Sequence, residues 1–564
     1  MKSEYIVKFS LIFFVLLITK NQAESQIIKS ISRVSIDSSG RGLGVKNFNP
    51  NINGDGSVIS FTHIAPGIRG GRLRETPKVR LSKEGITRSV AYNQDGVPAN
   101  DGRVNDNGTF DSASRTSLSA DGKLIAFASD ANNLVPNDTN KRADIFVRNL
   151  TDGTIKRVNV TVNNEEAVEG GFLPRISANG KFVAFSAYSN NLVENDLNNE
   201  LDVFVKNLDT GGIVKVPNQG FRASVGKISG DGRFVAYYIC FSKENCNKDL
   251  NYPYLYDLQT GLQTPLTPGR FEYSHEISDN GNFAVIQSEL EPGSDPGINS
   301  KNFTQVFLYN RLTNDLSLIS VNQLGEISNS HAGRPDISAD GRFVTFYSDA
   351  SNLVEDDTND QEDIFILDRT TGKVLRLNLN SSCKQVEKSD IAGYRVAQPV
   401  VSADGKFVAF TSLDRMVTRP ISFNGFVQQA DRDQAADVYL VEVDFDNPLP
   451  VFNPNSTAPA LFLSLNCIGT EATFTFPRID LQLGTTSRAA VQSAPLTRLL
   501  EISKVDGSTR TKFVRRLTDK RNELTIKNLK PGNYQVRYKN EVTSNEQKIS
   551  DGFSELKFFT ISNS

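Results

Sequence analysis

Tryptophan is absent from this chain of 564 residues, methionine occurs twice and histidine three times. The scarcity of histidine counts against catalysis or metal binding by several converging imidazoles. A basic excess is also missing, because 62 Lys and Arg face 65 Asp and Glu. Proteins that bind nucleic acids hold phosphates with such an excess, so we expect no nucleic-acid partner.

Long apolar runs are missing, with one exception near the N-terminus. Lys2 and Lys8 accompany an apolar run of 11 residues, Phe9 to Thr19, and the small residue Ala23 follows in a polar stretch. This order is typical of a signal peptide, so residues 1–23 are predicted to direct export to the periplasm, the cell surface or the medium. An uncleaved membrane anchor is the alternative, but the run is short for a bilayer. No other segment has the length of a span, so we expect no membrane span in the mature chain.

Cysteine occurs only four times. No CxxC pair exists and no histidine lies near any of the four, which counts against a zinc site. An even number of cysteines in an exported chain favours disulfides, and four cysteines can pair in three ways. We predict that Cys240 bonds Cys246 within a short loop, and that Cys383 bonds Cys467 and ties the main body to the C-terminal region.

What the sequence does contain is one phrase that recurs seven times, with its shared glycine 49 to 66 residues from the next. In each copy an apolar stretch enters a turn of Ser, Asp or Asn, and Gly, and a second apolar run such as Phe182 to Phe185 follows. Glycine suits such a turn and the runs have the length of buried strands, so each copy predicts a β-hairpin. The copies are residues 51–61, 117–127, 175–185, 227–237, 276–286, 336–346 and 400–410.

A second shared phrase follows several copies, as in residues 143–160, 201–218 and 362–379. It predicts another hairpin, which turns at Asp152-Gly153 in the first of these segments. Two hairpins per unit make a four-stranded antiparallel sheet that cannot bury both faces alone. We therefore predict an all-β fold in which residues 24–446 form a seven-bladed β-propeller.

The two ends of this region complement each other. The last unit has a third strand, Asp437 to Val443, but no fourth strand before Asn447-Pro448. Ile31 to Ile36 resembles the fourth strand of other units. We predict that this N-terminal strand pairs antiparallel with residues 437–443 and closes the ring, which removes exposed sheet edges.

The phrase from Ser402 to Phe410, SADGKFVAF, and the later phrase DIFV, from Asp144 to Val147, resemble the TolB-type, WD-like propeller repeat. The resemblance covers about residues 27–445. It implies the propeller architecture and a role as a binding platform, but it does not identify a substrate, because one fold hosts many functions.

Beyond the repeats the composition changes. Residues 447–459 are rich in Pro, Asn and Ser and are predicted to form a linker. Residues 460–564 alternate as strands, and the segment from Leu529 to Tyr538 is similar to the later strands of a fibronectin type III or related immunoglobulin-like domain. We expect a small β-sandwich of that kind.

The strongest candidate site is the acidic connection between the hairpins. Oxygen side chains that alternate in a loop suit a hard cation such as Ca²⁺, so these residues are candidate metal ligands. The alternative, which we prefer, is that Asp and Asn cap turns and that the last Asp anchors the third strand. The residues are Asp138, Asn140, Asp144, Asp196, Asn198, Asp202, Asp357, Asn359 and Asp363, and the last unit offers Asp431, Asp433 and Asp437.

No catalytic residue is assigned. His63, His275 and His331 are scattered, and a lone histidine such as His275, expected on an innermost strand near the channel mouth, is more often structural. The sequence has no G-x-S-x-G nucleophile motif, and too few residues follow the propeller for an α/β-hydrolase domain. No cofactor is expected other than calcium as the alternative above.

These observations favour an exported, non-enzymatic protein that presents its propeller to a protein or glycan partner. The rival is a secreted polysaccharide hydrolase or lyase with carboxylates near the channel as acid and base. A cluster of inward-pointing Asp, Glu, Arg and His at a channel mouth favours the rival, and small or apolar lining favours binding. The sequence does not predict an oligomeric state.

Overall fold

The computed structural model describes most of residues 27–446 and eight strands beyond them. The predicted signal peptide, residues 1–23, lies outside the described residues. Every regular element among the described residues is a strand, and none of them forms a helix long and apolar enough to cross a membrane. The described residues before the last eight strands are 27–36, 42–43, 47–65, 74–81, 86–100, 116–241, 251–266, 271–289, 303–355, 357–359, 361–380, 385–386, 396–413, 416, 421–423, 426–428 and 436–446.

The chain divides into two compact units. The larger holds Ile31–Asn380 and Lys384–Val443, and the other holds Asp444–Ser564 with Met1–Ser30 and Ser381–Cys383.

Six four-stranded antiparallel sheets follow one another along the larger unit, each made of four consecutive strands. The first three are β2 (Asn47–Ile52), β3 (Val58–Ala65), β4 (Arg74–Leu81) and β5 (Ile86–Ser89); β6 (Thr116–Leu118), β7 (Leu124–Ser129), β8 (Asp144–Asn149) and β9 (Ile155–Arg157); and β10 (Gly171–Ile176), β11 (Phe182–Ala187), β12 (Asp202–Asn207) and β13 (Ile213–Lys215). The next three are β14 (Arg222–Ile228), β15 (Phe234–Cys240), β16 (Asn251–Asp257) and β17 (Gln263–Pro265); β18 (Phe271–Ile277), β19 (Phe283–Glu289), β20 (Thr304–Asn310) and β21 (Asp315–Leu318); and β22 (Ala332–Ile337), β23 (Phe343–Ser348), β24 (Asp363–Asp368) and β25 (Lys373–Arg376).

A further four-stranded sheet combines both ends of the region in the order β1-β30-β27-β26. The backbone N–H of Val34 donates to the carbonyl of Val438 at 2.7 Å, and the Ser32 hydroxyl donates to the carbonyl of Leu440. Partner numbers fall as strand numbers rise, so the pairing is antiparallel. The prediction that the N-terminal strand completes the last sheet is confirmed. The strands are β1 (Ile28–Arg33), β26 (Val396–Val401), β27 (Phe407–Ser412) and β30 (Asp437–Val443), with a hairpin of β28 (Ile421–Phe423) and β29 (Phe426–Gln428) between the last two.

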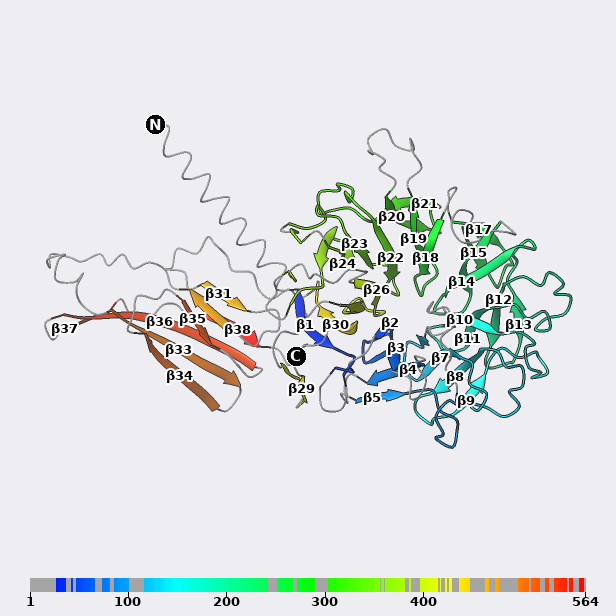
Figure 1. The fold of residues 1–564 in the computed structure, drawn as a ribbon. Coiled ribbons are helices and arrows are strands. Elements are labelled where there is room, and N and C mark those ends of the chain that lie inside the picture. Colours follow the sequence, from blue (N-terminus) through cyan, green and yellow to red (C-terminus); the bar gives the residue numbers. More distant parts are fainter. Residues whose placement is uncertain are drawn as a thin grey trace. The chain divides into compact units, whose positions relative to one another are not determined.

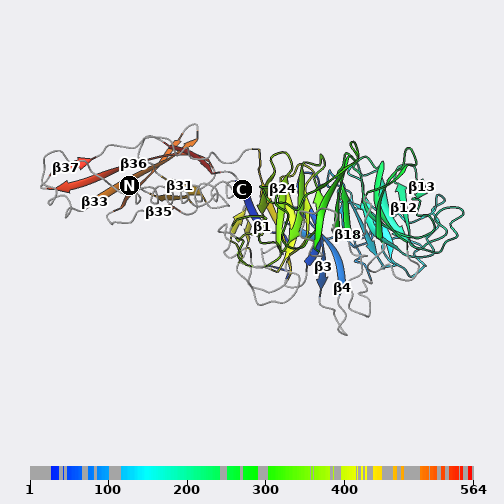
Figure 2. The same cartoon turned by 90° about the horizontal axis from the view of Figure 1, so that it is seen from above.

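The first strands of the sheets surround a common axis, which makes the arrangement a β-propeller (Figure 1). Seen from a direction turned by 90°, the strands of the larger unit run in roughly the same direction, from one face of that unit to the other (Figure 2). The turns after the first strands are joined by backbone hydrogen bonds from sheet to sheet. These run from the N–H of Gly54 to the carbonyl of Ala120, then Ala120 to Ala178, Asn179 to Gly230, Gly230 to Asp279, Asn280 to Ala339, Ala339 to Ala403, and Ala403 back to Gly54.

Side-chain contacts also join each sheet to the next around the axis. The residue two positions after each turn glycine lies against the turn glycine of the next sheet, and a Cβ at Gly405 would meet Cδ2 of Phe343 at 2.0 Å. Glycine is therefore required by close approach as well as by the turn. The contacts are Val58 with Gly122, Leu124 with Gly180, Phe182 with Gly232, Phe234 with Gly281, Phe283 with Gly341, Phe343 with Gly405, and Phe407 with Gly56.

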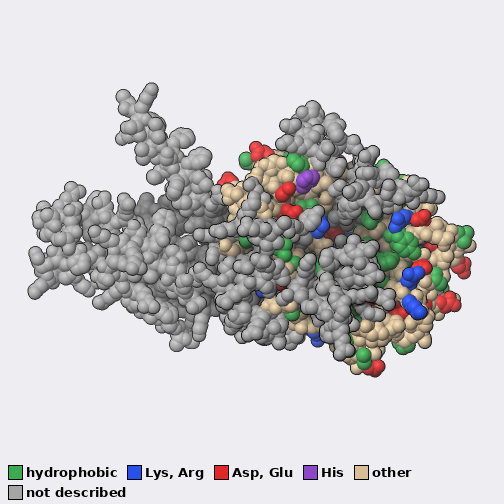
Figure 3. All heavy atoms as spheres, viewed as in Figure 1, with side chains coloured by type: hydrophobic (Ala, Val, Ile, Leu, Met, Phe, Trp, Pro, Cys, Tyr) green, Lys and Arg blue, Asp and Glu red, His purple; other side chains and the backbone are tan. Residues whose placement is uncertain are grey.

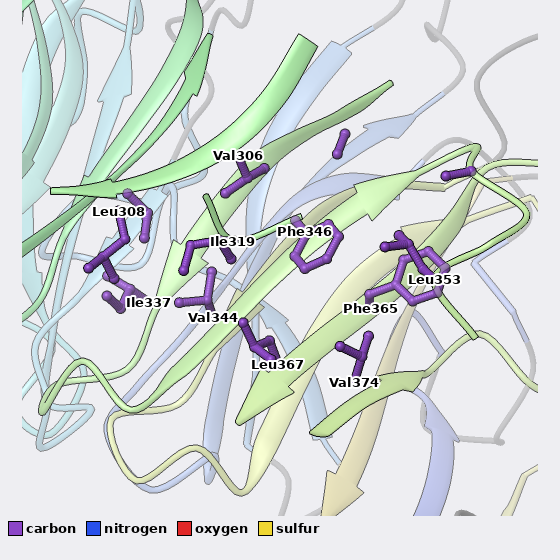
Figure 4. Packing of buried hydrophobic residues seen from close by; sticks show 13 residues of the cluster. Val306, Leu308, Ile319, Ile337, Val344, Phe346, Leu353, Phe365, Leu367 and Val374 are labelled. Atoms are coloured by element: carbon purple, nitrogen blue, oxygen red, sulfur yellow. The ribbon is translucent and has the colours of Figure 1, made fainter. Parts of the chain in front are cut away.

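Apolar side chains fill the space between neighbouring sheets. In one such cluster Val306 and Leu308 of β20 lie near Val344 and Phe346 of β23, and Phe365 of β24 joins them (Figure 4). These side chains are almost fully buried. Because one sheet alone would leave its apolar faces in water, the stacking of neighbours supplies the core.

The described residues of the C-terminal part of the smaller unit form strands. A three-stranded sheet has the order β31-β32-β35, and a five-stranded sheet has the order β34-β33-β36-β37 with β38 paired to β36. The fibronectin type III identity stays a prediction. The strands are β31 (Phe462–Leu465), β32 (Ala472–Thr475), β33 (Leu496–Asp506), β34 (Thr509–Leu517), β35 (Glu523–Ile526), β36 (Gly532–Ser544), β37 (Gln547–Ser550) and β38 (Lys557–Ile561).

Cys240 at the end of β15 is disulfide-bonded. Cys246, Cys383 and Cys467 lie outside the described residues, so the predicted pairing stays a prediction.

Candidate functional site

A cavity of about 430 Å³ lies where the innermost strands of the four-stranded sheets meet. Its lining comes from β2, β6, β10, β14, β18, β22 and β26, from the turns that follow them, and from Tyr238 of β15. This size falls in the range of small-ligand pockets.

Four of these strands share a backbone irregularity that faces the cavity. The residue before a proline has a positive φ, and the strand pairing shifts there by a bulge. Such a conformation is costly for residues other than glycine, and it marks positions that the surrounding structure holds in place. The residues are Asn49 (φ 53°), Leu173 (52°), Arg334 (46°) and Gln398 (52°).

Just beyond the bulge, side chains link one sheet to the next. Asn51 Oδ1 accepts from the N–H of Leu118 at 2.9 Å. Ser117 Oγ accepts from the N–H of Ile176 at 3.1 Å. In the same way, Asp336 Oδ2 accepts from the N–H of Val401 at 2.8 Å. These polar side chains link neighbouring sheets along the wall of the cavity.

At the same strand position, β10, β14 and β18 carry charged residues. Lys227 Nζ lies 3.1 Å from Asp336 Oδ1 and 3.7 Å from Glu276 Oε2, and Arg175 NH2 lies 3.9 Å from Glu276 Oε1. Burial alone would lower the pKa of Lys227, but Asp336, Glu276 and then Asp279 raise it well above its usual range. Lys227 therefore stays charged and is neutralised by its acidic neighbours.

Asp279 occupies a turn position where the other sheets have only Gly or Ala. A Cβ at Gly230 would lie 2.8 Å from the Cβ of Asp279, so the glycine makes room for this larger residue. Burial raises the pKa of Asp279, Lys227 opposes the rise, and Asp336 adds to it. Asp279 thus adds a third acidic group near Lys227.

The cavity therefore contains the kind of charged cluster that favours the enzymatic alternative, but its bases Lys227 and Arg175 are each paired with acidic neighbours. Among the histidines, His63 Nδ1 lies 2.8 Å from Asn47 Oδ1, and His331 Nδ1 accepts from the N–H of Thr304 at 3.2 Å. Neither histidine lines the cavity. His275 belongs to β18, and its side chain lies outside the described residues.

The acidic loops contain the turn caps that the sequence predicts. Asn140 Oδ1 accepts from the N–H of Arg142 at 2.8 Å, Asn198 Oδ1 from that of Glu200 at 3.2 Å, and Asn359 Oδ1 from that of Gln361 at 3.1 Å. Asx side chains cap turns in this way.

The loop carboxylates converge on a basic side chain, which the sequence analysis missed. Arg157 NH1 lies 2.9 Å from Asp144 Oδ2, 3.9 Å from Asp138 Oδ1 and 2.5 Å from Glu166 Oε1. The base always follows the third-strand aspartate by 13 residues, on the fourth strand. In the other loops Lys215 lies 2.7 Å from Asp196 and 2.8 Å from Asp202, and Arg376 lies 3.2 Å from Asp357 and 3.3 Å from Asp363.

The oxygens of Asp138, Asp144 and Glu166 lie within 4.8 Å of one another, as cation ligands would. Arg157 already contacts all three, so the geometry favours a structural clasp. Calcium binding stays a prediction. Burial and the neighbouring Asp144 raise the pKa of Asp138 to about 6, because two or three carboxylates share one base. Asp431 and Asp433 of the last unit lie outside the described residues, whereas Asp437 pairs with Arg33.

On the face drawn in Figure 3, acidic and basic side chains of the described residues are interspersed. Single-sign fields steer charged ligands, and the described side chains on that face are of mixed sign.

No family model matches the chain, and no curated protein matches it. Solved structures do match. TolB from Acinetobacter baumannii is 16% identical with a TM-score of 0.32 over 56% of this chain and 65% of that one, so the chain spans less than two thirds of that protein. The β-propeller domain of the Trilobed protease from Pyrococcus furiosus is 12% identical (TM-score 0.43, 72% and 98% covered), and an oligogalacturonate lyase from Vibrio parahaemolyticus is 10% identical (0.44, 74% and 94%). The propeller assignment rests on the strand pairing described above.

Proposed function

We propose that this chain is an exported binding protein without catalytic activity, which presents its propeller to a protein or glycan partner. The observation that carries the proposal is the pairing within the channel. Lys227 contacts both Asp336 and Glu276, and Asp336 also holds the N–H of Val401. Groups committed to holding neighbouring sheets together are poorly placed to transfer protons in a reaction, because a general acid or base must exchange its proton with a substrate.

We also propose a count of blades, a role for the C-terminal region and a location for this protein. The composite sheet of β1, β26, β27 and β30 serves as the seventh blade, and the backbone bond from Ala403 to Gly54 supports that count. The C-terminal region acts as a fibronectin type III-like spacer or second contact. Export to the periplasm, cell surface or medium follows from the apolar run of residues 9–19 and agrees with a disulfide at Cys240.

Purified residues 24–564 test the proposal. We expect saturable binding to a component of the native envelope or to an oligosaccharide. Two variants of Lys227 then test what its charge contributes to binding. Lys227→Met removes the charge, and Lys227→Arg retains it. Turnover of any polysaccharide by the purified protein contradicts the proposal.

The second candidate function is a polysaccharide hydrolase or lyase. Glu276 and Asp336 both lie near Lys227 at the cavity, and Asp279 has a raised pKa, so the channel holds carboxylates in two different environments. Paired carboxylates of that kind serve glycosidases. New reducing ends or unsaturated products, abolished by both Glu276→Gln and Asp336→Asn in folded protein, would establish this alternative.

A further inference from the structure

Two residues with amide side chains, on neighbouring first strands, line the cavity, and these amides have no partner among the described residues. Asn49 of β2 and Gln398 of β26 both line it, and both are partly buried. Among the described residues, neither side chain hydrogen-bonds to another. Each amide offers two donors and an acceptor, and polar groups in such a site are normally satisfied by water or ligand.

The backbone holds these amides in place. Both residues have positive φ and precede a proline, an unfavourable combination that persists only where the structure enforces it. Sheets β2 and β26 are neighbours through the bond from Ala403 to Gly54. The two amides therefore come from the same strand position of two adjacent sheets.

The opposite wall carries the charged network. In the circle of sheets, β14 and β18 lie across from β2 and β26, and they supply Lys227 and Glu276, whose side chains are 26% and 19% exposed. The charges of the lining residues balance, with three basic and three acidic side chains. These are Arg175, Lys227, Arg334, Glu276, Asp279 and Asp336.

From this arrangement we infer that the channel binds the end of a neutral oligosaccharide, with the Asn49 and Gln398 amides as its hydrogen-bonding partners on one wall. The inference rests on the proposed binding function and names its ligand class. Hydroxyl groups both donate and accept, as the amides and the opposing Lys227–Glu276 pair do. A balanced lining gives an anionic or cationic ligand no net electrostatic advantage.

The test is calorimetric titration of residues 24–564 with cellotetraose, maltotetraose and tetra-N-acetylchitotetraose, beside tetragalacturonic acid. The variant Asn49→Gly/Gln398→Gly removes both amides, and glycine accepts the positive φ without strain. Asn164→Gly/Gln219→Gly is the matched control, because it also removes two amides at positive φ (61° and 55°), from exposed residues that do not line the cavity.

We expect at least one neutral tetrasaccharide to bind, and the double variant to weaken its binding by about tenfold or more through lost hydrogen bonds. Asn164→Gly/Gln219→Gly should change the affinity by less than about threefold, because neither residue lines the cavity. Absence of neutral tetrasaccharide binding, preference for tetragalacturonic acid, or equal loss in the control overturns the inference. The inference is also overturned if the double variant captures an envelope protein with the affinity of the unsubstituted protein. That outcome leaves the proposed binding function intact. Degradation of a tetrasaccharide overturns both.

Discussion

Arg33 and Asp437 form a buried ion pair between residues at the two ends of the propeller region. Asp437 also accepts from the Ser35 hydroxyl, so Arg33 at the end of β1 and Ser35 two residues later engage one carboxylate. The same relation recurs within single sheets. Arg157 pairs with Asp144 while Asn159, two residues later, donates to that carboxylate at 2.7 Å. The N-terminal strand thus reproduces, from a distant part of the chain, the base and polar partner of an ordinary fourth strand.

Arg33→Ala should destabilise the propeller by about 3–5 kcal/mol, because it leaves the Asp437 charge buried without its base. Urea unfolding followed by circular dichroism measures this change. The control is Lys123→Ala, which removes an exposed pair with Asp121 and should cost less than about 1 kcal/mol. Equal effects of the two substitutions would show that Arg33 does not hold the closure.

Gly405→Ala should be far more harmful than Gly372→Ala. Both glycines have φ near 70° (73° and 71°), but only Gly405 faces a neighbour, Phe343, whereas nothing lies within 4 Å of a Cβ at Gly372. The Gly372 variant should cost about 1–2 kcal/mol for the backbone alone. The Gly405 variant adds a steric clash of about 1–3 kcal/mol or more. Thermal unfolding of the two variants measures the difference. Similar melting temperatures would show that the contact between Gly405 and Phe343 does not limit the size of the residue at position 405.

Stability should rise as the pH falls from about 7 towards about 4. Burial, with Asp144 or Asp363 as neighbours, raises the pKa of Asp138 and of Asp357 to about 6 each. These folded-state values exceed the unfolded value of about 4, so the folded protein takes up these protons first and gains stability as the pH falls.

Asp138→Asn/Asp357→Asn should therefore flatten this pH dependence and raise stability at pH 8, by about 1 kcal/mol or less per site after solvent screening. Melting temperatures across the pH range measure both effects. Asp152→Asn is the control, since hydrogen bonds from Thr154 lower the pKa of exposed Asp152 and place its titration below this window. If the melting temperature of the double variant changes with pH as steeply as that of the unsubstituted protein, the raised pKa values of Asp138 and Asp357 are not the cause of the pH dependence.

Calcium should leave the melting temperature of the unsubstituted protein unchanged relative to chelator, because Arg157 contacts Asp138, Asp144 and Glu166. Arg157→Gln removes that base and leaves three carboxylates together. Calcium should then raise the melting temperature of the variant by several degrees through binding to the folded state. A calcium shift in the unsubstituted protein would instead establish the metal site that the sequence suggests as an alternative.

Local pattern alone predicts much of this protein. The turn glycines and apolar runs identify the hairpins, because strand and turn preferences act over a few residues. The missing fourth strand after Val443 and the orphan strand at Ile31 predict the closure between distant segments, because a repeat reveals what each unit lacks.

The channel and the clasps depend on tertiary structure. Arg157 follows Asp144 by 13 residues, and this recurrent spacing was available in the sequence, but only the pairing of β8 with β9 makes the two side chains meet. Lys227, Glu276 and Asp336 belong to three different sheets, so no local pattern indicates that they share a cavity. Their contact is decided by the closed circle of sheets, which brings residues far apart in the chain to the same level of one axis.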